Sequence, residues 1–455
     1  MNRREFLKTA AAAAATPAFA AGQTPNIVFI LLDDLGYGDL GCYGGGLRTP
    51  NIDHLAGEGM RFTHHYSANP VCSPSRAGLL TGRYPTRVGV PRVLFPNDTS
   101  GLDLGERTLA NVLKDRDYKT MCIGKWHLGR PEPYLPTSRG FDEYFGIPYS
   151  NDMNPRPLMH NTKVIEEPAV LETLTPRYTE QALKFIERSK DGPFFLYMPH
   201  TYPHIPLAAS ARFRGKSPDG LYGDVVEEVD WSVGEVLGAL KKNGLESNTL
   251  VMFSSDNGPW YQGSPGKLRG RKGSTYEGGV REPFIVRFPG KVPAGRVNDS
   301  ISSMMDVFPT VAKLTGAPLP PKPLDGVDAW PVWTGSRPAV ERDALLYFDY
   351  VYLQCARLGP WKLHISRYNS MVYNPPPVDG RINLPLKHPE LYNLLDDPDE
   401  SYDVAPEHPE VVAKIQGRID ELIKTFPDEI QKAYAETMAR STRDTPAAAL
   451  PARKK

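Results

Sequence analysis

The chain has 455 residues, of which 40% are hydrophobic and 23% are charged, a composition typical of a globular protein with an ordinary core. Lys+Arg and Asp+Glu both number 53, so the formal net charge is zero and the chain lacks the overall basic excess of a nucleic-acid-binding protein. No apolar run reaches the roughly 18–20 residues that a membrane-spanning helix needs.

The first residues are typical of an export signal. Arg3 and Arg4 precede a weakly apolar, alanine-rich run that ends in an A-x-A-like site at Ala18-Phe19-Ala20. The adjacent arginines favour a signal of the twin-arginine type, and the alternative is a disordered basic tail. We therefore predict an export signal over residues 1–22 and export to the periplasm or the medium.

Four short apolar runs predict strands that are buried on both faces, as in a parallel sheet. They are Asn26–Leu32, Tyr118–Ile123, Phe194–Met198 and Thr249–Ser254. Helical spacing of apolar residues occurs between them, near Leu109–Leu113, Tyr178–Ile186 and Val225–Leu240. This alternation predicts an α/β sandwich over residues 23–340, with a large, mainly parallel central sheet flanked by helices.

The pattern changes after about residue 340. Leu345–Tyr352 and Trp361–Ile365 are expected to form antiparallel strands joined through Gly359-Pro360, with another strand at Leu391–Leu395. An apolar stripe at helical spacing follows from Val411 to Phe426. We expect a small C-terminal α+β subdomain over residues 341–440 and a flexible tail over residues 441–455.

Polar side chains follow all four predicted strands of the central sheet. They are Asp33 and Asp34, then Lys125 and His127, then His200 and His204, and finally Asp256 and Asn257. Ligands bind beyond the carboxyl ends of the strands in open α/β sheets, so these groups are expected to share one edge. Each pair taken alone is also compatible with a simple turn.

The oxygen donors of this set indicate a metal site. Asp33, Asp34, Asp256 and Asn257 supply three carboxylates and an amide, and such a set would repel itself without a cation. Oxygen ligands favour Ca²⁺, or less strongly Mg²⁺, over zinc.

Cys72 lies where a helix is expected to start, because Ser73-Pro74-Ser75 favours a helix N-terminus and the helix can continue to Thr81-Gly82. Backbone N–H groups, the helix dipole and nearby Arg76 would favour a thiolate at this place. The alternative is a buried structural cysteine. The other cysteines are Cys42, Cys122 and Cys355; a Cys42–Cys122 or Cys122–Cys355 disulfide is possible, but free thiols are favoured.

The pattern Cys72-x-Pro74-x-Arg76, followed by Thr81-Gly82-Arg83, resembles the signature of type I sulfatases, whose cysteine is oxidised to formylglycine after synthesis. Other blocks resemble the same family in the same order: LLDDLGYGDLGCYGG, MCIGKWHLG, YFGIPYSND, SSDNGPW, GRKGSTYEGGVREP and ELYNLLDDPDE. The resemblance is closest to the arylsulfatase A and N-acetylgalactosamine-6-sulfatase branch. It implies an alkaline-phosphatase-like fold and hydrolysis of sulfate esters.

The resemblance also implies a role for each matching residue. Calcium would be held by Asp33, Asp34, Cys72, Asp256 and Asn257. Cys72, as hydrated formylglycine, would be the nucleophile and Arg76 would steady it. Lys125 and Lys272 would bind sulfate oxygens, His127 and His204 would transfer protons, and Ser150 would support the site near His127. The implied partners are a sulfated substrate, expected to be a carbohydrate, and a formylglycine-generating maturation enzyme.

Three other functions compete with this prediction. They are a phosphomonoester or phosphonate ester hydrolase of the same superfamily, a non-catalytic binder of sulfated glycans, and a plain cysteine–histidine hydrolase, which gives no role to the acidic set. The basic run Lys267, Arg269, Arg271 and Lys272 could steer an anionic substrate or be a solvated loop.

The sequence does not decide four features: the choice between two histidines, one turn, and the roles of two loops. Only an H-x-P context favours His204 over His200, and Asp117 stands where the family often has glycine. The loops Asn151–Thr175 and Tyr350–Lys387 carry no pattern that indicates a particular sugar or aryl group.

Overall fold

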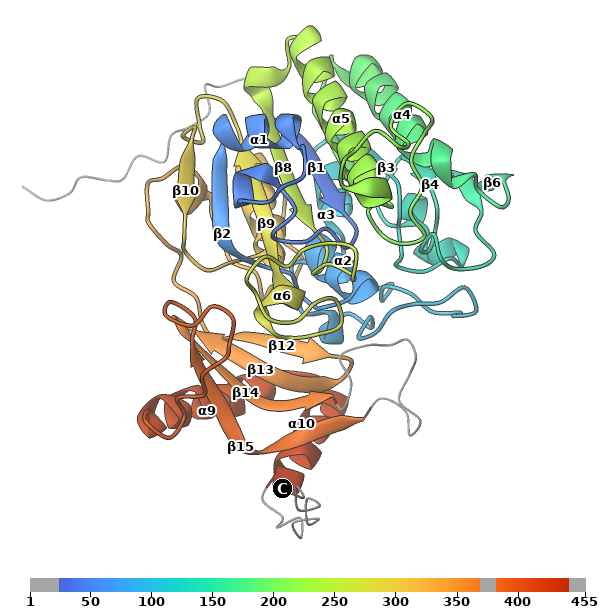
Figure 1. Ribbon diagram of the computed structural model, residues 1–455. Helices are drawn as coiled ribbons and strands as arrows, with labels where there is room; N and C mark the ends of the chain where they lie inside the picture. The colour runs from blue at the N-terminus through green and yellow to red at the C-terminus, as the bar shows by residue number, and fades with distance from the viewer. Residues whose placement is uncertain (1–23, 369–381, 442–455) are drawn as a thin grey trace, which may run out of the picture.

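The computed structural model of the protein describes residues 24–368 and 382–441. The predicted export signal and the predicted tail beyond Ser441 lie outside the described residues. Figure 1 shows a large α/β part, and a smaller part formed by the C-terminal residues packs against one end of it.

The large part is built on one central sheet. Its strands are β1 (Asn26–Leu32), β2 (Met60–Tyr66), β3 (Lys119–Ile123), β4 (Glu143–Gly146), β5 (Leu158–His160), β6 (Lys163–Glu166), β7 (Phe194–Pro199), β8 (Thr249–Ser255), β9 (Arg281–Arg287), β10 (Arg296–Asn298) and β11 (Ser302–Ser303). Within the described residues these eleven strands lie in the order β10-β2-β9-β8-β1-β7-β3-β4-β5-β6, and β11 pairs with β2.

The middle of the sheet is parallel, as the sequence predicts. β1 pairs in parallel with β7 and β8, and β3 pairs in parallel with β7 and β4. These four central strands β1, β3, β7 and β8 are the four apolar runs of the sequence, and every residue of β1, β7 and β8 is buried. β9 was not predicted; it runs antiparallel between β8 and β2 and begins with Arg281-Glu282-Pro283, which reads as a loop.

Helices cover both faces of the sheet. They are α1 (Pro50–Gly57), α2 (Cys72–Thr81), α3 (Leu109–Lys114), α4 (Leu174–Ser189), α5 (Gly220–Lys242), α6 (Glu277–Val280), α7 (Val307–Thr315) and α8 (Trp330–Trp333). Alternate residues of β1 point to opposite faces, so Val28 and Ile30 pack with α1, α4 and α5, while Phe29 and Leu31 pack with α2, α3 and α7. The predicted α3, α4 and α5 are confirmed.

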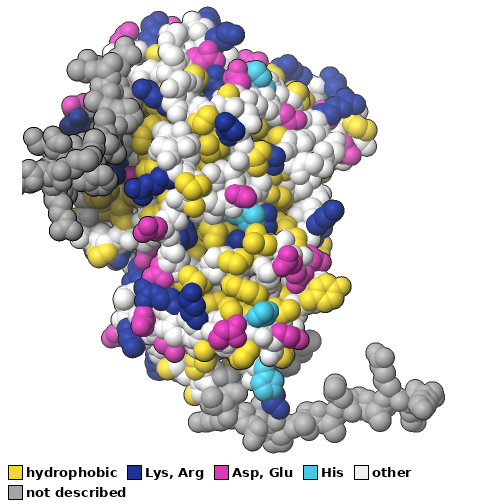
Figure 2. Space-filling model, turned by 90° about the vertical axis from the view of Figure 1, so that its left-hand side faces the viewer, with side chains coloured by type: hydrophobic (Ala, Val, Ile, Leu, Met, Phe, Trp, Pro, Cys, Tyr) yellow, Lys and Arg dark blue, Asp and Glu magenta, His cyan; other side chains and the backbone are white. Residues whose placement is uncertain are grey.

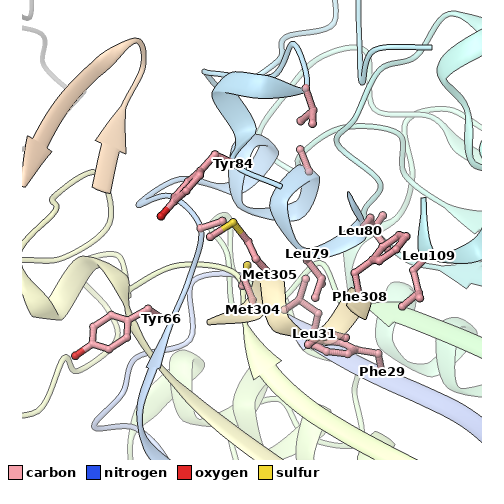
Figure 3. Close-up of a cluster of buried hydrophobic side chains, with 14 of the residues drawn as sticks. Phe29, Leu31, Tyr66, Leu79, Leu80, Tyr84, Leu109, Met304, Met305 and Phe308 are labelled. Carbon is pink, nitrogen blue, oxygen red and sulfur yellow. The ribbon is translucent and has the colours of Figure 1, made fainter. Parts of the chain in front are cut away.

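The packing of α2 against β1 and α7 fixes the position of the helix, and its first residue lies near the carboxyl end of β1. Leu79 and Leu80 are buried near Phe29 and Leu31 of β1 and close to Phe308 of α7 (Figure 3). Burying each of these leucines stabilises the fold by roughly 1.5–3 kcal/mol. The helix ends at Thr81, where Gly82 adopts a left-handed conformation with φ 67°. The first turn of α2 is therefore held in place by its last turns.

The described residues of the C-terminal part form a four-stranded antiparallel sheet and two helices. They are β12 (Leu345–Asp349), β13 (Tyr352–Leu358), β14 (Trp361–Tyr368), β15 (Asn383–Asn393), α9 (Pro409–Ile423) and α10 (Asp428–Ser441). The single predicted strand over Leu345–Tyr352 is wrong, because the chain turns at Tyr350, whose φ is 57°. The partner of β14 across Gly359-Pro360 is therefore β13.

The structure also tests the predictions for the cysteines and for the turn at Asp117. All four cysteines are free thiols, so neither possible disulfide forms. Asp117 has a φ of 61°, a conformation that glycine adopts readily, and the turn before β3 therefore forms without one. No helix of residues 24–368 and 382–441 has the length and hydropathy to cross a bilayer. Figure 2 shows Lys, Arg, Asp and Glu side chains interspersed on one face.

Candidate active site

The first acidic pair lies at the carboxyl end of β1. Asp33 and Asp34 are buried, and Asp34 has a φ of 65°, which turns the chain sharply after the strand. β8 runs parallel to β1 with Ser255 beside Leu32, so the two strands end together. Asp256, which follows β8, therefore lies at the same edge of the sheet. Its Oδ1 accepts a hydrogen bond of 3.3 Å from the Asp34 amide.

Asn257 joins this group through its side chain. Its Nδ2 donates to Asp34 Oδ1 at 2.7 Å, and its Oδ1 is buried with no hydrogen-bond partner among the described residues. A buried amide oxygen is costly without a partner, so this atom is suited to a cation or a donor that enters the site.

Cys72 is the first residue of α2, as predicted. Its thiol donates to Asp33 Oδ1 at 3.5 Å. Burial, followed by the charge of Asp33, raises the pKa of the Cys72 thiol well above its ordinary value. The expectation of an activated thiolate is therefore wrong for the unmodified side chain, because desolvation outweighs the helix start.

Arg76 lies one turn further along α2 and is fully buried. Its Nη2 is 2.8 Å from Asp256 Oδ2 and 3.5 Å from Asp33 Oδ2, and its Nη1 donates to the Lys125 carbonyl at 2.6 Å. One guanidinium thus joins the ends of β1, β3 and β8. A buried arginine needs such paired carboxylates, because its charge cannot be removed.

Lys125 and His127 follow β3. Lys125 Nζ lies 2.5 Å from Asp33 Oδ2 and 3.1 Å from Ser150 Oγ. His127 has a φ of 63°, and its Nε2 is 2.9 Å from the Leu94 carbonyl. The carbonyl only accepts, so Nε2 carries the hydrogen and the neutral ring leaves its buried Nδ1 unprotonated, with no hydrogen-bond partner in the described part of the chain.

The two histidines after β7 have different surroundings. His200 is in the core, edge-on to Tyr178 with ring centres 6.3 Å apart. His204 Nε2 lies 3.6 Å from Asp34 Oδ2 and 3.4 Å from Ser150 Oγ. The structure therefore brings His204 to the site and leaves His200 outside it. Ser150, expected near His127, has its hydrogen-bond contacts with Lys125, Asn151 and His204.

Lys272 reaches the site from the loop between β8 and α6. Its Nζ lies 2.8 Å from Asp34 Oδ1. Its neighbours in the basic run have other roles: Arg271 donates to the Trp260 and Gly263 carbonyls, and Arg269 donates to the Glu400 carbonyl. Only part of the run is thus directed toward the acidic group.

These residues surround a cavity of about 530 Å³. Its lining includes Asp34, Cys72, His127, Ser150, His204 and Lys272. Sequence reasoning missed the rest of the lining, which is Val71, Arg92, Val93, Phe95, Asp152, Met153, Ile205, Trp260, Asp349, Tyr350 and Tyr368. Asp349 and Tyr368 end strands β12 and β14, and the others lie outside the helices and strands. Asp152, Met153, Tyr350 and Tyr368 fall in the two segments whose sequence indicated no particular substrate.

Charge at the site is concentrated and mixed. Burial alone would raise the pKa of Asp33, but the charges of Lys125, His204 and Arg76 outweigh it and hold that pKa well below its ordinary value. Burial and the charge of Asp33 raise the pKa of Asp256 to about 6. Ligand atoms of Asp33, Asp34, Cys72 and His204 lie within 4.8 Å of one another, a spacing that could hold a metal ion. This group shares Asp33, Asp34 and Cys72 with the predicted ligand set.

Comparison with known families identifies the family of the chain. Residues 25–317 match the family model described as sulfatase. The chain belongs to the sulfatase family. Residues 340–447 of this sulfatase match the C-terminal region of aryl-sulfatase, and residues 1–20 match the signal sequence of the twin-arginine translocation pathway. The predicted family and the predicted export are confirmed.

Curated relatives agree with the predicted branch. Arylsulfatase A of Homo sapiens is 39% identical over 443 residues, which cover 87% of both chains. N-acetylgalactosamine-6-sulfatase of Canis lupus familiaris is 40% identical over 386 residues, which cover 77% of this sulfatase and 74% of that protein. The chain is therefore an enzyme of the class that hydrolyses sulfate esters.

Solved structures agree in fold. A Bacteroides thetaiotaomicron protein, described with the metabolism of multiple glycosaminoglycans, has a TM-score of 0.80 and 31% identity, covering 88% of this sulfatase and 99% of that chain. A sulfatase from Pseudoalteromonas sp. has a TM-score of 0.79 and 29% identity, covering 90% and 92% of the two chains. The predicted alkaline-phosphatase-like fold is confirmed.

Proposed function

We propose that this sulfatase hydrolyses sulfate monoesters of carbohydrates, using formylglycine made from Cys72 and a bound calcium ion. One observation carries the proposal: Asp33, Asp34 and Cys72, from two segments of the chain, meet Lys125 and Lys272 beside a cavity of about 530 Å³, which Asp34, Cys72 and Lys272 line. Two buried positive groups, Arg76 and Lys125, together with the partly buried Lys272 and buried carboxylates, suit an anion bound beside a cation.

The acidic residues fit calcium by their chemistry. Asp33, Asp34 and Asp256 supply carboxylates, and Asn257 Oδ1 is a buried acceptor with no partner among the described residues. Hard cations prefer such oxygen donors. A bound calcium ion would supply positive charge beside the sulfate group. Asp33, Asp34, Asp256 and Asn257 would hold it, with the side chain at position 72 as a further ligand.

Position 72 needs an oxygen nucleophile rather than a thiolate. The pKa of the Cys72 thiol is raised by burial and by Asp33, which disfavours the plain cysteine–histidine hydrolase. Formylglycine at this position, once water adds to its aldehyde to give a gem-diol, would supply a nucleophilic oxygen and a second hydroxyl that allows sulfate to be released. A formylglycine-generating maturation enzyme is accordingly a proposed partner of the chain.

Lys125 and Lys272 are placed to hold sulfate oxygens. They pair with Asp33 and Asp34 from two sides, at 2.5 and 2.8 Å. Each ammonium has three donors, so each can contact a carboxylate and a ligand oxygen together. Their charges would offset the single negative charge of a sulfate ester.

His127 and His204 are proposed to move protons at the cavity wall. The unprotonated Nδ1 of His127 is buried, and burial together with Lys125 and Arg76 holds the pKa of this ring well below its ordinary value. Because the neutral ring leaves Nδ1 unprotonated, His127 can accept a proton from a hydroxyl at position 72. His204 carries its hydrogen on Nδ1, next to the Ile205 carbonyl, so its Nε2 faces Asp34 and Ser150 and can receive and pass a proton.

The lining on the substrate side suits a sugar. Trp260, Tyr350 and Tyr368 provide aromatic rings, while Arg92 and Asp152 provide polar groups. Such a mixture binds the apolar faces and the hydroxyl groups of a carbohydrate. The glycosaminoglycan context of the Bacteroides structure and the N-acetylgalactosamine-6-sulfatase relative support the same substrate class.

Matched esters test the proposal. Sulfate and phosphate esters of one phenol, followed by a panel of sulfated mono- and oligosaccharides, should give faster release of sulfate than of phosphate and turnover of at least one sulfated sugar. Mass spectrometry of the Cys72 peptide, from protein made with a maturation enzyme, should show a loss of about 18 Da. Faster phosphate release would instead favour a phosphate or phosphonate ester hydrolase, and full activity with an intact thiol would exclude formylglycine.

A further inference from the structure

We propose that Glu400, in the C-terminal part, is a positioning residue for Lys272 in the active site. The inference rests on the proposed function, which gives Lys272 contact with the sulfate group. Glu400 lies in the ELYNLLDDPDE segment, to which the proposed chemistry assigns no role. No atom of Glu400 lines the cavity, so it would act only through the loop that carries Lys272.

That loop, residues 269–278, leaves the body of the protein and returns to it at nearly the same point. The Gly278 amide donates to the Arg269 carbonyl at 2.7 Å, which ties together the two ends of residues 269–278. The ends approach so closely that a Cβ atom on Gly278 would lie 2.4 Å from the Gly270 carbonyl oxygen. Lys272 therefore sits on a short loop whose base is fixed.

The large part of the molecule holds the loop near Lys272 through backbone contacts. The Lys272 amide donates to the Pro259 carbonyl at 3.1 Å, and the Gly273 amide donates to the Pro70 carbonyl at 2.8 Å. Pro70 lies two residues before Cys72, so the same contact links the loop to the start of α2.

The C-terminal part holds the remainder of the loop through side chains. Thr275 Oγ1 donates to Gln354 Oε1 of β13 at 3.0 Å. The Tyr276 ring stacks on His364 of β14, with ring centres 4.8 Å apart. Residues 269–277 thus lie between the cavity and the antiparallel sheet, and both sides contact them.

Glu400 joins these contacts at one carboxylate. Its Oε2 accepts from the Glu277 amide at 2.6 Å, at the end of the loop. Its Oε1 lies 2.7 Å from His364 Nε2 and 3.2 Å from Lys362 Nζ, and its carbonyl accepts from Arg269 at 2.6 Å. Both ends of the Lys272 loop are therefore attached to one residue of the C-terminal part.

The chemistry of these contacts requires an ionised carboxylate. Glu400, Glu277 and Lys362 are completely buried, and Lys362 Nζ also lies 3.0 Å from Glu277 Oε1. Burial alone would raise the pKa of Glu400, but Lys362 and His364 outweigh it and hold that pKa below its ordinary value. Both carboxylate oxygens face donors, so a glutamine at 400 would place its NH₂ group against one of them.

The loop leaves little freedom between Glu400 and the site. Only four residues separate Lys272 from Glu277, so loss of the Glu400 contact would allow the Lys272 ammonium to shift. Misplacement of a catalytic group by about 1 Å can cost on the order of 10²-fold in rate. The C-terminal antiparallel sheet would thus set the position of an active-site lysine.

A double-mutant cycle tests the inference. Sulfate release and thermal unfolding are measured for Glu400→Gln, Lys272→Ala, the double variant and a matched control, Asp230→Asn. Asp230 is also a buried carboxylate that accepts from backbone amides, those of Asn51 and Ile52, but it holds α1 and not the Lys272 loop. We expect Glu400→Gln to lower kcat/KM about 10–100-fold and Asp230→Asn to change it less than about 3-fold.

The double variant separates positioning from general destabilisation. If Glu400 acts through Lys272, the double variant should be about as slow as Lys272→Ala alone. Independent effects that multiply would overturn the inference, and so would a Glu400→Gln enzyme within about 3-fold of the wild type. If Glu400→Gln does not fold, Glu400→Asp replaces it in the same cycle, because it keeps the charge but shortens the reach of the carboxylate to the Glu277 amide. A multiplying or absent effect of this variant also overturns the inference.

The outcome for Lys272→Ala keeps the two proposals apart. An unimpaired Lys272→Ala enzyme would remove the role of Lys272 from the proposed function, and the inference would fall with it. An impaired Lys272→Ala enzyme together with an unimpaired Glu400→Gln enzyme would overturn only the inference.

Discussion

The Sγ atom of Cys72 lies 3.5 Å from Oδ1 of Asp33, although the two residues are 39 positions apart in the chain. The contact joins the first residue of α2 to the carboxyl end of β1. Arg76, one turn along the helix, reaches both Asp33 and Asp256. The start of α2 and the ends of two parallel strands therefore form one buried charged unit.

Replacing the proposed nucleophile should abolish catalysis. Cys72→Ala removes the thiol that conversion to formylglycine requires, so sulfate release should fall by on the order of 10⁴-fold or more. The measurement is the initial rate on an aryl sulfate with enzyme matured in the same way. Cys42→Ala is the control, because Cys42 is partly exposed and lies outside the cavity lining, and it should keep wild-type activity. A Cys72→Ala enzyme with comparable turnover would contradict the proposed nucleophile.

Removal of the metal should inactivate the enzyme reversibly. A calcium chelator should lower both activity and the unfolding temperature, because the carboxylates at the strand ends would lose the cation that offsets their repulsion. Added Ca²⁺ should restore both better than Mg²⁺. Asp34→Asn should weaken this response to Ca²⁺, and restoration by Zn²⁺ alone would argue against an oxygen-ligated calcium site.

Loss of Asp256 should destabilise the fold through Arg76. Asp256→Ala leaves the buried guanidinium with the Lys125 carbonyl and only the longer of its two carboxylate contacts, that to Asp33, so the free energy of unfolding should fall by about 3–5 kcal/mol. Urea unfolding in the presence of a chelator measures this effect without a contribution from calcium. The control is Glu143→Ala, which breaks a partly exposed ion pair with Arg188 and should cost less than about 1 kcal/mol. Equal costs for the two variants would contradict the buried-charge argument.

His200 should make the fold sensitive to acid. Burial lowers the pKa of His200 from 6.5 to about 3 in the folded state, so the unfolded chain takes up the proton first. The contribution of the neutral ring is therefore complete above pH 6.5 and is lost as the pH falls toward 3, with a slope of about 1.4 kcal/mol per pH unit.

His200→Leu should make that pH dependence shallower. It also removes two buried ring nitrogens without hydrogen-bond partners among the described residues, so this variant should not be less stable at pH 5 than the wild type. Urea midpoints between pH 7.5 and 4.5 measure the difference. An unchanged slope would show that His200 does not titrate as its burial implies.

Much of the fold could be predicted because its central strands have distinctive sequences. β1, β7 and β8 are continuous apolar runs, since helices cover both of their faces. β9 could not be predicted in the same way, because it begins with Arg281 and Glu282 and its burial depends on β2 and β8. The turn at Tyr350 was also hidden, because a tyrosine gives no signal for a positive φ.

The sequence by itself determined which residues follow each strand and that Cys72 begins a helix. Parallel strands end at a common edge, so the positions of the acidic residues in the chain were sufficient to predict that they lie close together. Only the tertiary structure decided between His200 and His204, placed Ser150 against Lys125 and His204, and attached the Lys272 loop to Glu400. Those contacts depend on how connecting loops fold back over the sheet, and no local periodicity records the distance between segments that lie far apart in the chain.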